Sequence, residues 1–258
     1  MTTQGQSLLK TIADDQILFL RLNRPEQMNA LDEELRNSIA AAIEEFDRDA
    51  QLRVAVLVGE GGRAFSAGAD LKELAQRPPL GREGRIPYDQ LERCRKPLIA
   101  AIDGYCLAGG FELTLHCDIR LATEQSQFGL PEPRWSLLGG PGLHHLSRTI
   151  PLGEALLLQL TGGRMDARRA FEIGLVQRLA ADRDELMQSV DDVASQILLC
   201  APLAVEAIKR VVKCGRDLPP EYSRKLAEPL VEMIARTRDR EEGPRAFAER
   251  RMPVWRME

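Results

Sequence analysis

The chain has 258 residues, of which 44% are hydrophobic, 29% are charged and 5% are aromatic, and its formal net charge is −4. This composition is typical of a globular protein, and a chain of this length buries roughly 70–75% of its unfolded surface, so we expect no disorder and no need for disulfides. The longest apolar run, Pro97–Ile102, is far shorter than the roughly 20 residues of a membrane helix. The net negative charge argues against binding to nucleic acid or to an anionic membrane.

The cysteines, the histidines and the first residues predict a cytoplasmic protein without a metal. Five cysteines form no CxxC pair and several lie in apolar runs, which is typical of reduced thiols: Cys94, Cys106, Cys117, Cys200 and Cys214. Only three histidines are present and two of them are adjacent, so we expect no histidine-rich metal site. The N-terminal segment has neither the basic-then-apolar pattern of a secretory signal nor the arginine-rich pattern of a transit peptide.

Apolar periodicity predicts alternating strands and helices in the first half of the chain. In order, we predict a strand at Gln16–Leu22, a helix at Ala30–Asp49, a strand at Arg53–Val58, a short helix at Leu71–Gln76, a strand at Pro97–Ile102, a helix at Phe111–Cys117 and a strand at Ile119–Ala122. Between them, Arg77–Tyr88 contains three prolines and two glycines and is the best candidate for a mobile loop.

The second half of the chain is predicted to become helical. Gln127–Pro133 is expected to be a loop. The predicted helices are Gly139–Ser147, with a Gly/Pro-rich start, Glu154–Leu160, Ala167–Phe171, Glu185–Leu199, Ala201–Cys214, Tyr222–Arg236 and Gly243–Arg251. No tandem repeat of constant period is visible, and the helical tail is too short to be an independent catalytic domain.

The segment Ala64–Lys72 is rich in small residues and contains Gly68. Such a segment allows a ligand to approach the backbone closely, and its exposed N–H groups could bind an anion. On composition alone, a tight loop that follows a strand is the more ordinary interpretation.

In the segment Leu107–Leu113, Gly109 and Gly110 precede a predicted helix that carries Glu112 in its first turn. Free N–H groups and the positive end of the helix dipole would face a ligand there, and a thioester oxygen that gains negative charge is a suitable one. Stabilisation of this kind contributes about 3–4 kcal/mol per donor. The alternative is an ordinary helix start in which Glu112 complements the dipole.

In the segment Phe128–Pro133, Glu132 lies between two prolines. The prolines fix the backbone, which suits a positioned base, although a surface turn is an equally good interpretation. Two glutamates in one pocket could divide the acid and base roles, because like charges raise one pKa. The sequence by itself does not bring Glu112 and Glu132 together.

Taken together and in this order, the motifs resemble the enoyl-CoA hydratase/isomerase (crotonase) superfamily, and its hydratase branch in particular. The resemblance covers nearly the whole chain and is carried by Leu20–Pro25, Met28–Leu31, Ala64–Lys72, Lys96–Ile102, Gly104–Asp118, Phe128–Glu132, Thr161-Gly162, Gly174–Val176 and Phe247–Arg251.

The resemblance implies an α/β fold, a crotonase-like spiral of ββα units over residues 1–200. It also implies a helical C-terminal region over 201–258 that makes the contacts of a homotrimer or of a dimer of trimers. The substrate would be a coenzyme A thioester, with no separate cofactor and no metal. The implied reaction is the reversible hydration of a 2-enoyl-CoA.

The resemblance also implies roles for individual residues. Glu112 and Glu132 would be catalytic, and the backbone N–H groups of Ala69 and Gly109 would form an oxyanion hole. The implied contacts to coenzyme A or to the acyl group come from Arg24, Ala67, Gly68, Asp70, Leu71, Lys72, Trp135 and Gly140. The base that takes up the water proton would be mainly Glu132 or the pair of glutamates, and Glu132 would protonate C2 while Glu112 orients the water.

Three departures from the family pattern and the rival functions remain open at this stage. Trp135 is large for its position, so it either shapes the acyl pocket or packs in the core or at the trimer interface. Gly140 would offer a further N–H to the water, although the usual Gly-Gly-Thr is lost, and His144-His145 are expected to serve helix packing or the surface. The rival functions are a carnitinyl- or 3-hydroxyacyl-CoA dehydratase, a hydratase-lyase, an enoyl-CoA isomerase and, more remotely, a non-catalytic RNA-binding or scaffold protein.

Overall fold

The computed structural model describes residues 6–76 and 86–258, which form two compact units. The first unit contains the chain up to residue 94 together with residues 98–192, and the second contains residues 95–97 and 193–258. The predicted boundary at residue 200 therefore falls inside the second unit. Most of the predicted loop Arg77–Tyr88, from 77 to 85, lies outside the described residues.

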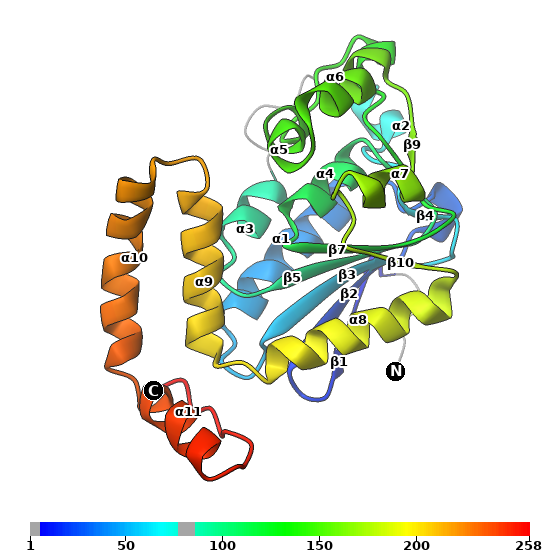
Figure 1. Cartoon of the computed structure of the whole chain (residues 1–258). Coiled ribbons are helices and arrows are strands. Elements are labelled where there is room, and N and C mark those ends of the chain that lie inside the picture. Colours follow the sequence, from blue (N-terminus) through cyan, green and yellow to red (C-terminus); the bar gives the residue numbers. More distant parts are fainter. Residues whose placement is uncertain (1–5, 77–85) are drawn as a thin grey trace. The chain divides into compact units, whose positions relative to one another are not determined.

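A six-stranded sheet forms the centre of the first unit (Figure 1). Its spatial order is β1 (Leu8–Ala13), β2 (Ile17–Leu22), β3 (Val54–Gly59), β5 (Leu98–Ile102), β7 (Ile119–Thr123) and β10 (Arg178–Ala180). From β2 onward all neighbours are parallel, which explains why these strands read as continuous apolar runs. The four predicted strands are confirmed, and β1 and β10, which the sequence analysis did not identify, occupy the two edges.

A second sheet of four short strands completes the first unit. Its order is β4 (Ala64–Ser66), β6 (Tyr105–Leu107), β8 (Gln127–Gly129) and β9 (Met165–Asp166). The first three strands are mutually parallel, and β9 runs antiparallel to β8. The prediction of a loop throughout Gln127–Pro133 was therefore wrong for its first three residues, which pair with β6 and not with solvent.

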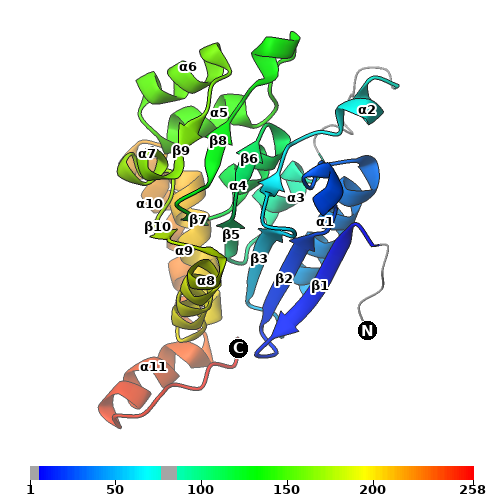
Figure 2. The same cartoon turned by 90° about the vertical axis from the view of Figure 1, so that its right-hand side faces the viewer.

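The two sheets are linked by a repeated path of the chain, visible in Figures 1 and 2. Three times in succession, a strand of the large sheet is followed within a few residues by a strand of the small sheet: β3 by β4, β5 by β6 and β7 by β8. A helical segment then leads to the next strand of the large sheet. This path is the predicted spiral of ββα units.

Helices pack on the sheets through their apolar faces. In the first unit they are α1 (Glu33–Arg48), α2 (Leu71–Leu74), α3 (Tyr88–Arg93), α4 (Gly109–His116), α5 (Gly142–Thr149), α6 (Leu152–Thr161), α7 (Ala167–Glu172) and the start of α8 (Arg183–Leu198). Asp32 caps α1 by accepting the N–H of Leu35 at 2.9 Å. Every residue of α4 is buried, so this helix forms part of the core. The predicted helices are confirmed, and α3 is an addition that the sequence did not indicate.

The second unit consists of helices, as predicted for the tail. It contains the end of α8 and the helices α9 (Pro202–Gly215), α10 (Pro220–Ala235) and α11 (Arg238–Ala248). Near its end, Glu242 accepts hydrogen bonds from Arg251, from the N–H of Val254 and from Arg245, and these bonds lower its pKa well below the usual range. Among the described residues, no helix is both long enough and apolar enough to cross a membrane.

Asn29 lies between β2 and α1, and its side chain binds the turn that leads from β3 into β4. It is fully buried and has a left-handed backbone conformation with φ of +54°. Its amide group donates to the carbonyl oxygens of Glu60 and Ala64 at 3.0 and 2.8 Å, and its side-chain oxygen accepts the N–H of Arg24 at 2.9 Å. One side chain thus holds three segments of the chain together.

We expect Asn29→Ala to lower the free energy of unfolding by roughly 3–5 kcal/mol, because each buried polar group left without a partner costs about 1–3 kcal/mol. The matched control is Asn23→Ala, which removes a single exposed hydrogen bond to the carbonyl of Gln6. Urea denaturation of both variants checks this. Equal losses in the two variants would contradict the role given to Asn29.

Candidate active site

The three segments with candidate chemistry follow three adjacent parallel strands. Ala67–Asp70 follows β4, Gly109 follows β6 after one residue, and Glu132 lies three residues beyond the end of β8. Because β4, β6 and β8 are neighbours in the small sheet and run in the same direction, their carboxyl ends meet at one edge. Ligands of α/β proteins bind at such edges, so this edge is the candidate active site.

The backbone N–H groups of Ala69 and Gly109 lie close together at this edge. Leu31 pairs with Ala69 in a parallel bridge, donating to the carbonyl of Gly68 and accepting the N–H of Asp70. In such a bridge the N–H of Ala69 points away from Leu31. A Cβ built on Gly109 would lie 3.7 Å from the nitrogen of Ala69. Because Gly109 is the first residue of α4, its N–H has no carbonyl one turn earlier to bind.

Close packing of small residues makes this approach of the two N–H groups possible. Gly68 has φ of +92°, and a Cβ there would lie 2.4 Å from the Cβ of Ala108. Ala108 itself has φ of +49° and ψ of −132° at the start of α4, which is a strained conformation for a residue with a side chain. The hydrogen bond from its N–H to the carbonyl of Gly129, at 2.8 Å, holds it there. Sequence reasoning missed Ala108, because nothing in an alanine indicates such a conformation.

Tyr88 is a further residue of the site that the sequence did not single out. It begins α3, is buried, and its hydroxyl donates to the carbonyl of Gly109 at 3.2 Å. Burial, with a contribution from the charge of Glu112, raises the pKa of Tyr88 well above its usual value, so the hydroxyl stays a neutral donor. The bond fixes the peptide that leads into α4.

Glu112 projects from the first turn of α4 into a buried position. Its side chain is 4% exposed, and its Oε1 accepts the N–H of Gly142 at 2.8 Å. Gly142 is the first residue of α5, so the N-terminus of that helix points at the carboxylate. Desolvation raises the pKa of Glu112 to about 7, against the lowering effect of the N–H groups of Gly142 and Gly140.

Glu132 begins a short 3₁₀ helix, Glu132–Trp135, and is only partly buried. Its Oε2 is inaccessible to solvent and has no hydrogen-bond partner among the described residues. Desolvation raises the pKa of Glu132 above its usual value. A buried carboxylate oxygen without a partner is uncommon in a folded protein and is typical of a site that awaits a ligand or a proton donor.

The structure brings the two glutamates together, which the sequence did not do. A Cβ built on Gly139 would lie 3.5 Å from Oε1 of Glu112 and 3.8 Å from Cδ of Glu132, so both carboxylates face this one glycine. The charge of Glu132 contributes to the raised pKa of Glu112. Two carboxylates in one desolvated pocket favour a state that shares a proton, which suits acid and base roles near neutral pH.

The segment between Glu132 and α5 carries two residues that the sequence analysis singled out, Trp135 and Gly140. Gly140 interacts through its N–H with Glu112, and so does Gly142, which the sequence analysis did not select, at 2.8 Å. The Gly/Pro-rich helix start was the signal that could have identified Gly142. Trp135 is 66% exposed, so it does not pack in the core of its unit.

The residues expected to contact coenzyme A lie on the β4 side of the site. Arg24 forms ion pairs with Asp32 and Asp70 at 3.2 and 3.1 Å. Asp70 also caps α2 by accepting the N–H groups of Lys72 and Glu73. Desolvation by itself would raise the pKa of Asp70. The hydrogen bond from the Arg24 side chain, followed by those from the N–H groups of Glu73 and Lys72, outweighs this effect and lowers the pKa below its usual value.

The other expected contacts differ in how exposed they are. The N–H of Ala67 donates to the carbonyl of Met28, and Gly68 allows the close approach described above. Leu71 and Lys72 are exposed beside them. Contacts of these residues with coenzyme A stay predictions.

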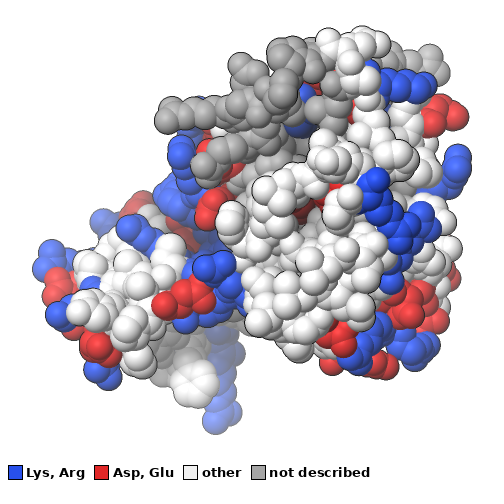
Figure 3. All heavy atoms as spheres, turned by 90° about the horizontal axis from the view of Figure 1, so that it is seen from above, with Lys and Arg blue, Asp and Glu red and all other residues white. Residues whose placement is uncertain are grey.

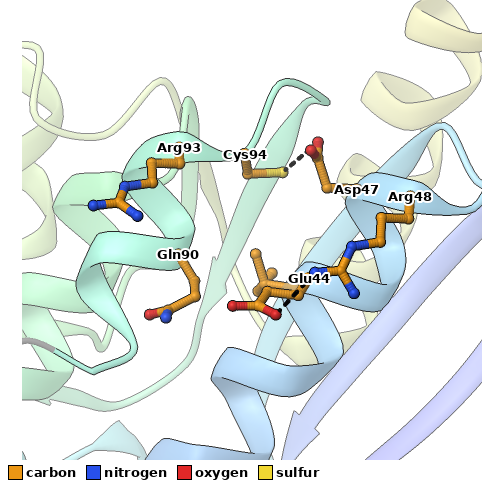
Figure 4. A pocket seen from close by; sticks show the side chains of 7 residues that line it. Glu44, Asp47, Arg48, Gln90, Arg93 and Cys94 are labelled. Atoms are coloured by element: carbon orange, nitrogen blue, oxygen red, sulfur yellow. Dashed lines mark hydrogen bonds and ion pairs between the residues drawn. The ribbon is translucent and has the colours of Figure 1, made fainter.

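Two other surface features of the first unit lie outside this site. A pocket of about 180 Å³ between α1 and α3 is lined mainly by charged and polar residues, and Cys94 donates there to Asp47 (Figure 4). Neither Glu112 nor Glu132 lines this pocket. The surface over α5 and α6 is largely uncharged (Figure 3). Four exposed leucines of α6 contribute to it: Leu152, Leu156, Leu157 and Leu160.

Comparisons with known proteins place this geometry in context. A sequence profile described as enoyl-CoA hydratase/isomerase matches residues 13–258. An (E)-benzylidenesuccinyl-CoA hydratase of Thauera aromatica is 36% identical over 93% of this chain and 95% of its own length, and a carnitinyl-CoA dehydratase of Salmonella typhi is 34% identical over the same shares.

The solved structures agree with these sequence matches. The crystal structure of an enoyl-CoA hydratase from Bacillus anthracis superimposes with a TM-score of 0.92 at 32% identity, covering 98% of this chain and 100% of that one. The predicted crotonase-like fold is thereby confirmed.

The raised pKa of Glu112 predicts a dependence of stability on pH. In the folded state the carboxyl binds its proton more tightly than at its ordinary pKa of 4.5, so stability is lost as the pH rises from about 4.5 through about 7. Glu112→Gln removes this effect. We expect the variant to gain on the wild type by up to about 3 kcal/mol between pH 4.5 and 8. Urea denaturation across this range measures the difference.

Glu132→Gln is the companion variant for this experiment. It keeps Glu112 but removes the neighbouring charge, so the pKa of Glu112 falls. The loss of stability with rising pH should then be complete at a lower pH than in the wild type. Parallel pH profiles for the wild type and Glu112→Gln would refute the raised pKa.

Proposed function

Because the chain belongs to the enoyl-CoA hydratase/isomerase family, whose members act on acyl-CoA thioesters, we propose that it reversibly adds water to the C2–C3 double bond of a 2-enoyl-CoA. The observation that carries this proposal is the pair of carboxylates, the buried Glu112 and the partly buried Glu132, facing one glycine. Hydration needs a base for the water and an acid for C2, and two coupled carboxyl groups meet both needs.

The N–H groups of Ala69 and Gly109 would polarise the substrate. A thioester carbonyl oxygen bound by both donors gains negative charge when water attacks, and donors fixed in advance stabilise this charge without reorganisation. Their withdrawal of electrons makes C3 electrophilic. The strained backbone at Ala108 supports this role, since strain of this kind is typical of functional sites.

Glu132 would take the proton of the attacking water and deliver it to C2, while Glu112 orients the water. The support for this division is that Oε2 of Glu132 has no partner among the described residues, whereas Oε1 of Glu112 is held by Gly142. In the reverse direction the same groups would remove water from a 3-hydroxyacyl-CoA. The chemistry uses only water and the thioester, so we propose no cofactor beyond the coenzyme A of the substrate.

A bulkier acyl group is the second candidate for the substrate. Two relatives of similar identity are named for a benzylidenesuccinyl and a carnitinyl thioester. Next to Glu132, Trp135, Leu137 and Leu138 are 66%, 46% and 84% exposed, and such apolar side chains could contact a large acyl group. A dehydratase that acts on such a thioester would use the same two carboxylates.

We also propose that the protein acts in the cytoplasm as a homotrimer or a dimer of trimers. The exposed leucines of α6 support self-association, because a contiguous apolar surface is typical of an interface.

Crotonyl-CoA hydration tests the proposed function directly. The purified protein should consume the enoyl-thioester absorbance, and Glu132→Gln should lower turnover by about 10²–10⁴-fold, the usual contribution of a general acid or base. Binding of the thioester should be retained, because the substitution preserves shape. The matched control is Glu124→Gln, which removes an exposed ion pair with Arg168 and should leave turnover unchanged.

Three outcomes of this assay would be informative. Full turnover in Glu132→Gln would refute the assignment of Glu132. Tight binding of crotonyl-CoA without turnover, together with turnover of an aryl or carnitine-type thioester, would favour the second candidate. Failure of all enoyl thioesters would refute the hydratase proposal.

Ala69→Pro tests the oxyanion hole, because proline has no N–H to donate. We expect kcat to fall by about 10²–10³-fold while KM changes little, since the interaction strengthens only in the transition state. The melting temperature reports on any distortion of the backbone. A folded variant with full kcat would show that Ala69 donates nothing to the reaction.

A further inference from the structure

Three potential metal ligands from three different helices lie close together, about one turn of α4 away from Glu112. They are Glu92 at the end of α3, His116 at the end of α4 and His145 in α5, and their ligand atoms all lie within 4.8 Å of one another. We propose that these three side chains bind a divalent transition-metal cation, with zinc as the best match. The proposal does not depend on the proposed function.

His116 is held in the form that a metal requires. Its Nδ1 lies 2.9 Å from the carbonyl oxygen of Glu112. A carbonyl oxygen can only accept, so Nδ1 carries the proton and, in the neutral ring, Nε2 carries the lone pair. Metal-binding histidines usually donate their other N–H to a carbonyl or a carboxylate in this way. The hydrogen bond thus selects Nε2 as the ligand atom.

The orientation of the His116 ring is also fixed in advance. The ring is 2% exposed and contacts two other rings, with centroid distances of 5.6 Å to Tyr88 and 4.6 Å to His145. Its position is therefore determined by packing as well as by the hydrogen bond. A rigid first ligand lowers the loss of conformational entropy on binding.

The other two ligands are able to close around an ion. Tetrahedral zinc with bonds of about 2.0–2.1 Å holds its ligand atoms about 3.4 Å apart, so the cluster must contract. Glu92 is exposed and has three rotatable side-chain bonds, and His145 is only partly buried. Small rotations of these two side chains bring their ligand atoms toward His116, and water would fill the fourth position.

The donor set selects the kind of ion. Two imidazoles and one carboxylate are typical ligands of zinc and of neighbouring transition metals, whereas calcium and magnesium prefer oxygen ligands alone. The sequence analysis expected no metal, because only three histidines are present and two of them are adjacent. The three residues become neighbours only through the packing of α4 on α3 and α5.

A cation here would join the two helices that hold Glu112. His116 lies one turn after Glu112 in α4, and α5, which carries His145, begins with the N–H of Gly142 that binds the Glu112 carboxylate. Residues four apart lie on one face of a helix, so binding would clamp α5 to α4 one turn from the Glu112 carboxylate, which should stabilise this part of the fold.

The test is a titration of the full-length, chelator-treated protein with Zn²⁺, followed by calorimetry. We expect one Zn²⁺ per chain and a rise in melting temperature that increases with the Zn²⁺ concentration. Titration with Co²⁺ provides a spectroscopic signature, because a site with nitrogen and oxygen ligands gives visible absorption bands that depend on its geometry.

Two variants and one matched control test the ligands. Glu92→Gln and His145→Ala each remove one ligand and should weaken Zn²⁺ binding by about 100-fold or more, since even the loss of an outer-shell partner costs about 10–100-fold. His144→Ala is the control, because His144 is the same residue type in the same turn of α5 but is exposed and lies outside the cluster. It should bind Zn²⁺ like the wild type.

Several results would overturn the proposal. They are the absence of Zn²⁺ binding at millimolar concentration, retention of wild-type affinity in Glu92→Gln or in His145→Ala, and an equal loss of affinity in His144→Ala. Glu92 is exposed, so Glu92→Gln is expected to fold and keeps the test decisive even if His145→Ala does not.

Discussion

The parallel pairing of β4, β6 and β8 is the constraint on which the rest of the structure depends. Each of these strands has only three residues, yet their common direction delivers Ala69, Gly109 and Glu132 to one edge of the small sheet. Strands this short are not stable by themselves. They are held because each follows shortly after a strand of the large sheet that is buried throughout (β3 and β5) or nearly so (β7), so the position of the site is set by the core of the unit.

The hydrophobic core also offsets the unfavourable free energy of burying polar groups at the site. Burying Glu112 and Glu132 in one pocket and keeping Ala108 at positive φ are unfavourable, and each requires surroundings that do not relax. Phe111 of α4 and Phe128 of β8 pack against each other with ring centroids 5.5 Å apart. They belong to the same two elements that lead to the glutamates, so apolar contacts fix the geometry of the carboxylates.

The sequence could predict the elements that are long and strongly patterned, and it failed for the short ones. The apolar run of β3 and the periodicity of α1 are sufficient to identify them, because burial on a sheet or on a helix face leaves a repeated signal. Three-residue strands such as β8 leave none. The same limit applies to the site: each motif was visible, but the meeting of Glu112 with Glu132 depends on the pairing of β6 with β8. The family resemblance, and not residue spacing, implied that the two glutamates act together. Glu92, His116 and His145 come from separate helices and had no sequence signal as a group.

The groups that would decide the reaction differ in kind from those that would decide the substrate. The two candidate oxyanion donors are backbone N–H groups, and Glu112 is buried and held by the backbone of Gly142, so their geometry follows from the fold. In contrast, the side chains of Trp135, Leu137 and Leu138 are exposed on the segment between Glu132 and α5. Substitutions there have small effects on stability and leave the carboxylates in place. If these side chains contact the acyl group as proposed, this separation explains how relatives of 34% and 36% identity match nearly the whole chain and yet are named for different acyl groups. Under that proposal, the acyl group and the chemistry depend on different parts of the structure, so the acyl group can change without disturbing the chemistry.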